Sequence, residues 1–116
     1  MNVVGGYVVP TNKAPTRLVN SLIVTSHIVV YGFTAFSVNV ATQYVLMYDG
    51  RDLPAAGAVP ILSLDCQTNT LRGVSWLPNG REFFEGIVLV TSSAAAGYTA
   101  NATADTLLDV QFDFID

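Results

Sequence analysis

Strict alternation of apolar and polar residues is the feature of this sequence that most limits its fold. The clearest example is the segment LLDVQFDF, at residues 107–114. The apolar residues at alternate positions are expected to face a core, and they are Leu108, Val110, Phe112 and Phe114. The polar residues between them are expected to face water, and they are Asp109, Gln111 and Asp113. In FSVNV, the same logic predicts that Phe36, Val38 and Val40 share a buried face. A period of two residues is typical of a β-strand with one buried face.

Turn signals separate these segments from other short apolar runs. Asp49-Gly50 is a turn pair, the loop at residues 50–60 is rich in proline and glycine, and LPNG at residues 77–80 suits a type I turn. Helical periodicity with helix caps is not found in the sequence. Seven to eight short strands with turns between them predict an all-β fold, an antiparallel β-sandwich of the jelly-roll or Ig-like kind.

The chain is expected to consist of a short arm and one folded domain. A length of 116 residues suits a single domain. Residues 1–17 carry Gly5-Gly6, Pro10 and Pro15, which interrupt regular structure. We therefore expect an extended N-terminal arm, with room for one short strand at YVVP, followed by a β-sandwich domain at residues 18–116. The arm lacks the basic region and apolar core of a signal peptide, so none is expected.

The densest apolar run is REFFEGIVLVTSS, at residues 81–93. Its apolar residues do not alternate, which predicts a central strand buried on both faces, with Phe84 in the core. Gly86 within the run indicates a bulge or a close neighbour. The run ends in Ser92 and Ser93, but the sequence has no G-x-S-x-G elbow, so we expect neither serine to be a nucleophile.

Residues for metal or acid–base chemistry are scarce. His27 is the one histidine of the chain and Cys66 is its one cysteine, which are too few ligands for a zinc site. A Ser-His-Asp catalytic triad would have to use His27. Asp49 and Asp52 lie three residues apart in a turn without the EF-hand spacing. We expect His27 to be a surface or edge-strand residue and Cys66 to be a buried apolar filler. The predicted protein is not an enzyme and has no catalytic residue, metal site or cofactor.

The low charge of the chain indicates contact with other subunits. Charged residues make up 12% of the chain, about half the usual fraction, and the net charge is −4. The sequence shows no basic footprint for nucleic acid or anionic lipid, so we expect neither as a partner. So few charges leave neutral and apolar surface for a neighbour to cover. We therefore expect a closed homo-oligomer, and a trimer in particular. The uncharged stretch from Leu18 to Tyr48 alternates, which favours strands over a membrane helix.

Several segments in a fixed order carry a family resemblance. They are YVLMYDG, the loop LPAAGAVP, the apolar ILSL, the run LPNGREFFEGIVLVTSS, and YTANATAD before an alternating end. From about Phe36 to Phe114 this order resembles small β-sandwich structural proteins of tailed bacteriophages, of the capsid decoration or cement type. The resemblance implies a location in the virion, assembly as a homo-oligomer, no enzymatic activity and no conserved site. It implies contact with the major capsid protein or with another virion protein.

A second function stays open at this point, a lectin-like or receptor-binding β module on a virion tail or a cell surface. Its candidates for stacking on sugars are Trp76, Tyr98 and Tyr48. For the structural role, the segment VVGGYVVP is apolar enough to lie on a neighbouring subunit or on a shell. The residues that we expect at an interface are Tyr7, Val8, Val9 and Trp76.

Overall fold

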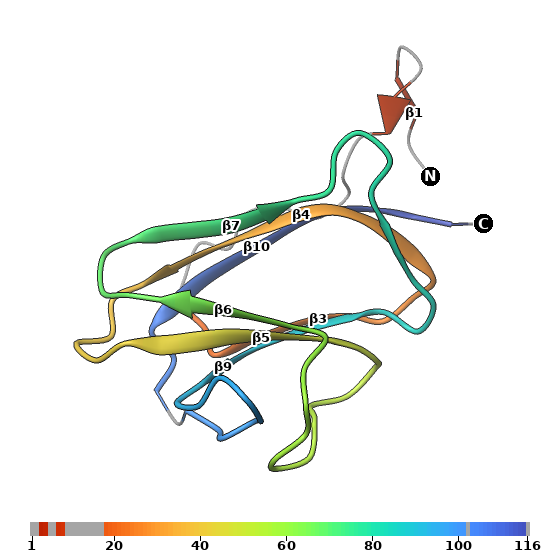
Figure 1. Cartoon of the computed structure of the whole chain (residues 1–116). Coiled ribbons are helices and arrows are strands. Elements are labelled where there is room, and N and C mark those ends of the chain that lie inside the picture. Colours follow the sequence, from red (N-terminus) through yellow and green to blue (C-terminus); the bar gives the residue numbers. More distant parts are fainter. Residues whose placement is uncertain (1–2, 5–6, 9–17, 102, 116) are drawn as a thin grey trace.

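The computed structural model of the chain describes residues 3–4, 7–8, 18–101 and 103–115. Eight strands form two four-stranded antiparallel sheets that pack face to face (Figure 1), which confirms the predicted β-sandwich. The strands of the sandwich are β3 (Ser21–Val24), β4 (Ile28–Ser37), β5 (Gln43–Asp49), β6 (Leu62–Cys66), β7 (Leu71–Ser75), β8 (Arg81–Phe83), β9 (Ile87–Ser92) and β10 (Thr106–Phe114).

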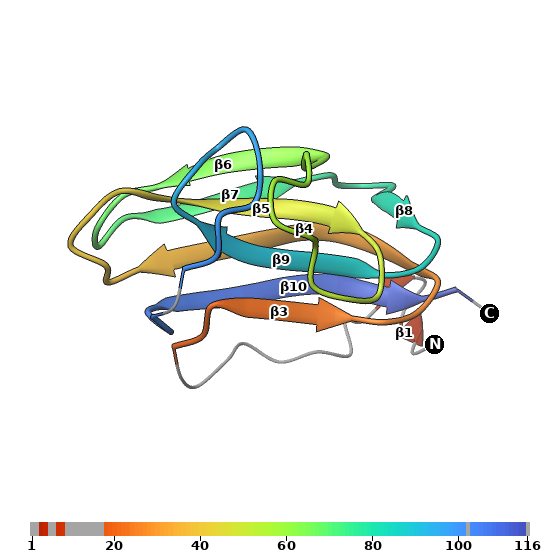
Figure 2. The same ribbon diagram turned by 90° about the horizontal axis from the view of Figure 1, so that it is seen from below.

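The two sheets are named here after their central strands. In the β4 sheet, β10 pairs with one edge of β4, while β7 and β8 pair in turn with the other edge. The β9 sheet has the order β3-β9-β5-β6. Figure 2 shows the two layers from below. Where β6 and β7 connect the sheets, the guanidinium of Arg72 donates to the carboxylate of Asp65 at 2.8 Å and closes that edge.

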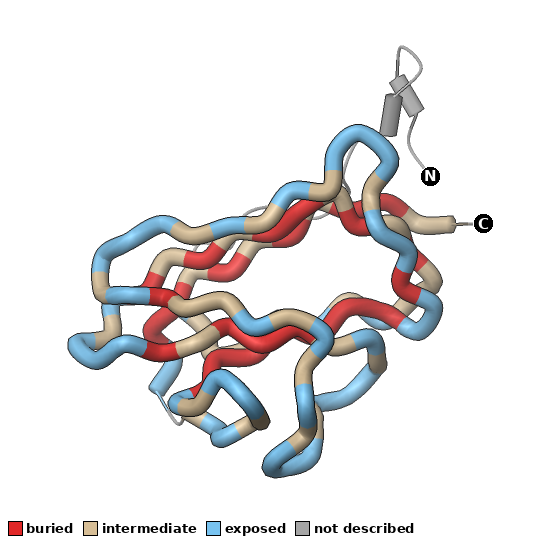
Figure 3. Tube along the Cα trace, in the orientation of Figure 1, coloured by how far each residue is buried: buried red, intermediate tan, exposed pale blue. Residues whose placement is uncertain are grey.

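The core lies between the inner faces of the two sheets. Its residues are fully or almost fully buried, and they come from every strand except the short β3 and β7. Figure 3 shows the buried residues along the middle of β4, β5, β9 and β10, and the exposed ones mostly in the loops and on β7. The buried members of this core are Ile28, Val30, Phe33, Ala35, Val45, Met47, Cys66, Phe83, Ile87, Leu89, Leu108, Val110 and Phe112.

Strand β4 contains one extra residue, and this reverses the predicted face of FSVNV. Along β10, Gln111 pairs with Gly32 but the next residue, Phe112, pairs with Val30, so Tyr31 is bulged out of the ladder. A bulge shifts the alternation of a strand by one residue.

The buried face after the bulge is therefore the opposite of the one that the sequence pattern predicted. Ala35 and Ser37 point into the protein, and Phe36 lies half-buried on the outer face. Val38 and Val40 are exposed in the loop that follows the strand. The prediction that Phe36, Val38 and Val40 share a buried face is wrong.

Strand β10 follows its predicted alternation, but Asp113 is fully buried rather than open to water. Asp113 pairs with Val29 on the outer face of the β4 sheet, and one oxygen of its carboxylate accepts from the amide of Phe114 at 2.8 Å. Near this position the turn at Gly80 folds against the sheet so closely that a Cβ on Gly80 would lie 2.6 Å from Val29. The turn at Gly80 therefore covers the outer face at Val29, and alternation alone does not reveal that Asp113 beside it is buried.

The run at residues 81–93 is not one strand but crosses from one sheet to the other. Its first part is β8 at the edge of the β4 sheet, and its second part is β9, whose six residues are all buried at the centre of the other sheet. Gly86 forms the crossing with a φ of 138°, and a Cβ there would lie 2.1 Å from the carbonyl oxygen of Val24. The predicted central strand is confirmed for β9 only.

The crossing also decides which phenylalanine is buried. Phe83 is 1% exposed in the core, whereas Phe84 is 67% exposed and stacks on His27. The prediction that Phe84 is a core residue is wrong, because the chain leaves the β4 sheet between the two positions.

This pair of adjacent residues provides a test of the fold. We expect Phe83→Ala to lower the free energy of unfolding by about 3–5 kcal/mol, because it leaves a cavity in the core. Phe84→Ala removes the same atoms from an exposed site and is expected to cost less than about 1 kcal/mol. Chemical denaturation of both variants measures the difference, and equal losses would contradict the assignment.

Candidate functional site

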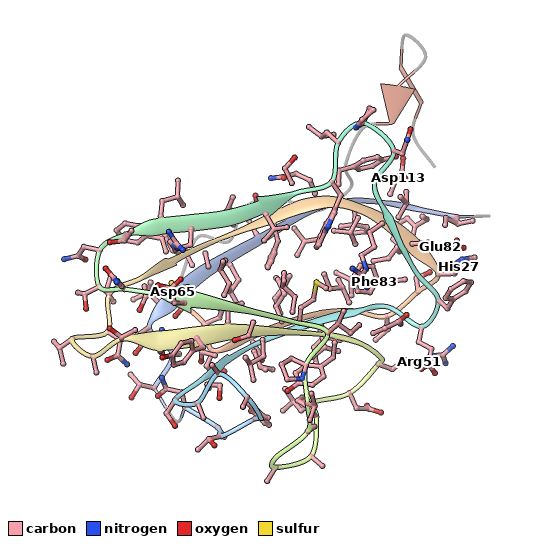
Figure 4. The ribbon with its side chains drawn as sticks, viewed as in Figure 1. His27, Arg51, Asp65, Glu82, Phe83 and Asp113 are labelled. Atoms are coloured by element: carbon pink, nitrogen blue, oxygen red, sulfur yellow. The ribbon has the colours of Figure 1, made fainter. Side chains whose placement is uncertain are left out.

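The histidine and serines singled out from the sequence do not meet. His27 hydrogen-bonds through Nε2 to the carboxylate of Glu82 on β8, and both side chains are partly exposed (Figure 4). Ser92 is buried at the far end of β9, where its hydroxyl donates to the carbonyl of Ala94 at 2.8 Å and accepts from the amide of Thr99 at 3.0 Å. Ser92 therefore fastens the loop that follows β9, and Ser93 is exposed beside it.

Cys66 lies at the end of β6 with no exposed surface, packed in the core. Burial raises the pKa of its thiol above the ordinary value, since the low dielectric of the core disfavours the thiolate. The expectation of a buried apolar filler at this position is confirmed.

The reactivity of Cys66 can be measured with a thiol reagent such as a colorimetric aromatic disulfide. At pH 8 we expect the native protein to react at least about tenfold more slowly than the protein in denaturant, because the thiolate is both scarce and inaccessible. A native rate equal to the denatured rate would show that the thiol is open to solvent.

Asp49 and Asp52 are the acidic pair predicted to lie in a turn, and Asp49 has a structural role. Its carboxylate accepts from the backbone amides of Phe84 and Glu85 at 3.2 and 3.1 Å, which ties β5 to the crossing between the sheets. Asp52 is exposed in the loop that follows. In the ranges that the structure describes, no three His, Cys, Asp or Glu side chains gather where they could hold a metal ion. Nor does this part of the chain contain a helix long and apolar enough to span a membrane.

The three aromatic candidates for sugar stacking do not lie together. Trp76 follows β7 and is half-buried, with its ring stacked on Phe33 in the core at a centroid distance of 6.2 Å. Tyr48 and Tyr98 pack over the outer face of the β9 sheet, and the hydroxyl of Tyr48 donates to the carbonyl of Ala58 at 2.7 Å. The structure brings Tyr48 and Tyr98 together but does not join them with Trp76.

The predicted interface residues of the arm fall partly outside the described residues. Tyr7 and Val8 form β2 (Tyr7–Val8), which pairs antiparallel with β1 (Val3–Val4). Val9 lies outside the described residues. The role of these residues and of Trp76 at an interface stays a prediction.

Two loops cover the outer face of the β9 sheet. The loops at residues 50–61 and 93–101 are joined by backbone hydrogen bonds from Gly57 to Tyr98 and from Tyr98 to Ala58, at 2.8 and 3.1 Å. Under them lies a second apolar cluster, whose fully buried members are Leu46, Val88 and Val90. This face is therefore closed by the chain itself.

The outer face of the β4 sheet, in contrast, has an open apolar region at one end. Three residues lie side by side across β10, β4 and β7, because Leu107 pairs with Phe36 and Phe36 pairs with Leu71. Leu71 is 67% exposed. Beyond this row, a shallow hollow is lined by Leu18, Val38, Asn39, Val40, Thr103, Ala104 and Asp105. The apolar residues of the row and the hollow, called the end patch below, are Leu18, Phe36, Val38, Val40, Leu71 and Leu107.

The loop that carries the end patch is held firmly by Asn39. Its side chain donates to the carboxylate of Asp105 at 2.5 Å and accepts from the amide of Ala41 at 2.8 Å. Its backbone amide donates to the hydroxyl of Ser37, and its carbonyl accepts from the hydroxyl of Thr68. On either side of this fixed residue, Val38 and Val40 are turned to solvent, and Val40 is 96% exposed.

A buried polar network supports this end of the sandwich. The amide nitrogen of Gln43 lies 2.8 Å from the hydroxyl of Ser37, 3.1 Å from the carboxylate of Asp105 and 2.6 Å from the hydroxyl of Thr106. All four residues are at most 5% exposed. The amide oxygen of Gln43 accepts a hydrogen bond from the side-chain amide of Asn101.

Sequence reasoning missed both the exposed valines of the end patch and the polar network beside them. It assigned Val38 and Val40 to the core, and it gave no role to Gln43 or Asp105. One available signal was the pair of polar residues Ser37 and Asn39 at the end of a long apolar strand, since such residues often bond to nearby backbone and end a strand.

The network can be tested at its centre. Gln43→Ala should lower the free energy of unfolding by at least about 1–3 kcal/mol, because it leaves buried partners without their hydrogen bonds. Gln67→Ala, at an exposed position one residue after β6, should change it by less than about 0.5 kcal/mol. Denaturant titration of the two variants measures both changes in the free energy of unfolding. A Gln43→Ala variant as stable as the wild type would mean that the network does not hold this end together.

Comparison with protein-family models, curated proteins and solved structures found no match to this chain. The functional proposal therefore rests on the geometry of the end patch, the composition of the chain and the resemblance of its segments.

Proposed function

We propose that this chain is a non-enzymatic structural subunit that works by protein–protein contact, of the kind that decorates and stabilises the capsid of a tailed phage. The observation that carries the proposal is the end patch, where apolar side chains are held open to solvent by an ordered polar network. The proposed setting is the virion, and the proposed partners are other copies of the chain and the major capsid protein or another virion protein.

The end patch has the properties of a surface made for contact. Contiguous exposed apolar residues on a folded protein often mark an interaction site. Binding costs conformational entropy when loops must become ordered, and a loop that is already ordered avoids part of that cost. Asn39 supplies this order, because its four hydrogen bonds fix the backbone between Val38 and Val40.

Three of the side chains singled out for chemistry support the same proposal, since they have structural partners. Asp49 binds backbone amides, Ser92 fastens a loop, and Cys66 packs in the core. A cement protein needs no such chemistry. It stabilises a shell by mass action, because it binds the assembled lattice and not the free subunits.

The lectin-like alternative has no comparable support. A sugar-binding platform would need several aromatic faces open on one surface. Trp76 instead stacks in the edge of the core, and Tyr48 and Tyr98 pack over the cluster beneath the loops of the other sheet.

A charge placed in the end patch tests the proposal. We expect the wild-type protein to be larger than its monomer mass of 12.4 kDa in light scattering at micromolar concentration. Val40→Asp should shift the mass to that of the monomer, because a carboxylate cannot be buried in an apolar contact without a large cost. The matched control is Val59→Asp, which places the same charge on a residue 80% exposed in the loop at residues 50–61 and should leave the mass unchanged.

Sedimentation with purified, expanded phage capsids provides the second measurement. The wild type and Val59→Asp should co-sediment, and Val40→Asp should stay in solution. A wild-type protein that is monomeric and also fails to bind capsids would reject the proposed function. Equal behaviour of the two aspartate variants would reject the end patch as the contact surface.

A further inference from the structure

The chain contains two dipeptides whose chemistry makes them prone to covalent change. They are Asp49-Gly50 and Asn79-Gly80. Glycine has no Cβ, so its amide nitrogen can approach the side-chain carbonyl carbon of the preceding residue without hindrance. The structure gives the two pairs different surroundings.

The pair Asp49-Gly50 is held at both of the groups that would react. The carboxylate of Asp49 accepts from two backbone amides of the crossing between the sheets. The amide of Gly50 donates to the carbonyl of Gly86 at 3.0 Å. This pair can therefore react only if the crossing comes apart.

Asn79 lies in the turn between β7 and β8, which Figure 3 shows as an exposed loop. Among the described residues, its side-chain amide has no hydrogen-bond partner. The backbone of the turn is held instead, because the amide of Gly80 donates to the carbonyl of Trp76 at 2.6 Å. The side chain of Asn79 is thus open to attack whenever that one backbone bond breaks.

We propose that Asn79 is a site of covalent modification, at which loss of the side-chain amide opens this turn permanently. In the first step the nitrogen of Gly80 gives up its proton and attacks Cγ of Asn79. A C–N bond forms, the bond from Cγ to Nδ2 breaks, and ammonia leaves with the proton. The product is a cyclic imide, in which the nitrogen of Gly80 carries no hydrogen.

Water then opens the imide at either of its two carbonyl carbons. Opening at Cγ gives an aspartate with an ordinary peptide bond to Gly80. Opening at the main-chain carbonyl gives an isoaspartate, in which the main chain runs through Cβ and Cγ and is longer by a single carbon atom. In both cases water supplies the hydroxyl of the new carboxylic acid and the hydrogen on the nitrogen of Gly80.

The native turn opposes the first step. The N–H of Gly80 is bound to the carbonyl of Trp76, and a bound backbone amide loses its proton only when the structure opens locally. The imide cannot restore this bond, because its nitrogen has no hydrogen. Reaction at Asn79 therefore proceeds through rare openings of the turn, and more slowly than in the unfolded chain.

The turn has no room for the longer main chain of an isoaspartate. Gly80 has a φ of 79° and packs so closely on the β4 sheet that a Cβ there would lie 2.6 Å from Val29 and 3.1 Å from Tyr31. An extra main-chain atom before Gly80 moves it against these neighbours or away from the carbonyl of Trp76. The isoaspartate keeps the turn open, whereas the aspartate lets it close again.

Peptide mapping by mass spectrometry, after incubation at mildly alkaline pH, measures the reaction. Aspartate and isoaspartate at position 79 should accumulate at least about tenfold faster in denaturant than in the native protein, because the native turn must first open. Asn79→Gln is the matched control. It keeps an exposed amide at this position but would need a larger ring, so it should stay unmodified in both states.

A second measurement separates the added charge from the added main-chain atom. The isoaspartate form, purified after removal of the denaturant, is compared with Asn79→Asp, which carries the same charge on an ordinary main chain. The isoaspartate form should unfold at a lower denaturant concentration than Asn79→Asp, and Asn79→Asp should unfold together with the wild type.

Each contrary result overturns a definite part of the proposal. An Asn79 that stays unmodified even in denaturant would overturn the modification site itself. Equal rates in the native and the unfolded protein would overturn the protection by the turn. An isoaspartate form as stable as Asn79→Asp would overturn the permanent opening. The proposed function is tested separately, because these measurements do not involve the end patch.

Discussion

Strand β4 pairs with three other strands, and the bulge at Tyr31 sets which of its side chains face the core. Before the bulge, Ile28 and Val30 point inward; after it, Ala35 and Ser37 do so. The bulge turns Phe36 to the outer face, where it meets Leu107 and Leu71. The core and the end patch therefore depend on the same inserted residue, because a shift by one position exchanges the two faces of a strand.

The inward turn of Ser37 also creates the polar network around Gln43. A buried amide is costly unless its hydrogen bonds are made, and here Ser37, Asp105 and Thr106 make them. Asp105 in turn holds Asn39, which fixes the loop of the end patch. Stability at this end of the sandwich and the order of the proposed contact surface thus have one physical origin.

The arrangement of covered and open surface favours contact through the end patch. The loops at residues 50–61 and 93–101 close the outer face of the β9 sheet, and the turn at Gly80 folds onto the β4 sheet near Val29. The end patch stays open. An apolar surface of this kind at one end of the sandwich is the geometry on which the proposed contact rests.

The sequence by itself determined the β class, the sandwich and the buried state of Cys66, and it placed a central strand within residues 81–93, where the structure has β9 at residues 87–92. These follow from periodicity, turn residues and apolar runs, which are local. It could not determine which of Phe83 and Phe84 enters the core, because the answer depends on where the chain crosses between sheets at Gly86. Nor could it locate the end patch. The bulge at Tyr31 arises from the pairing of β4 with β10, and only that long-range pairing decides whether Phe36 or Ser37 faces inward.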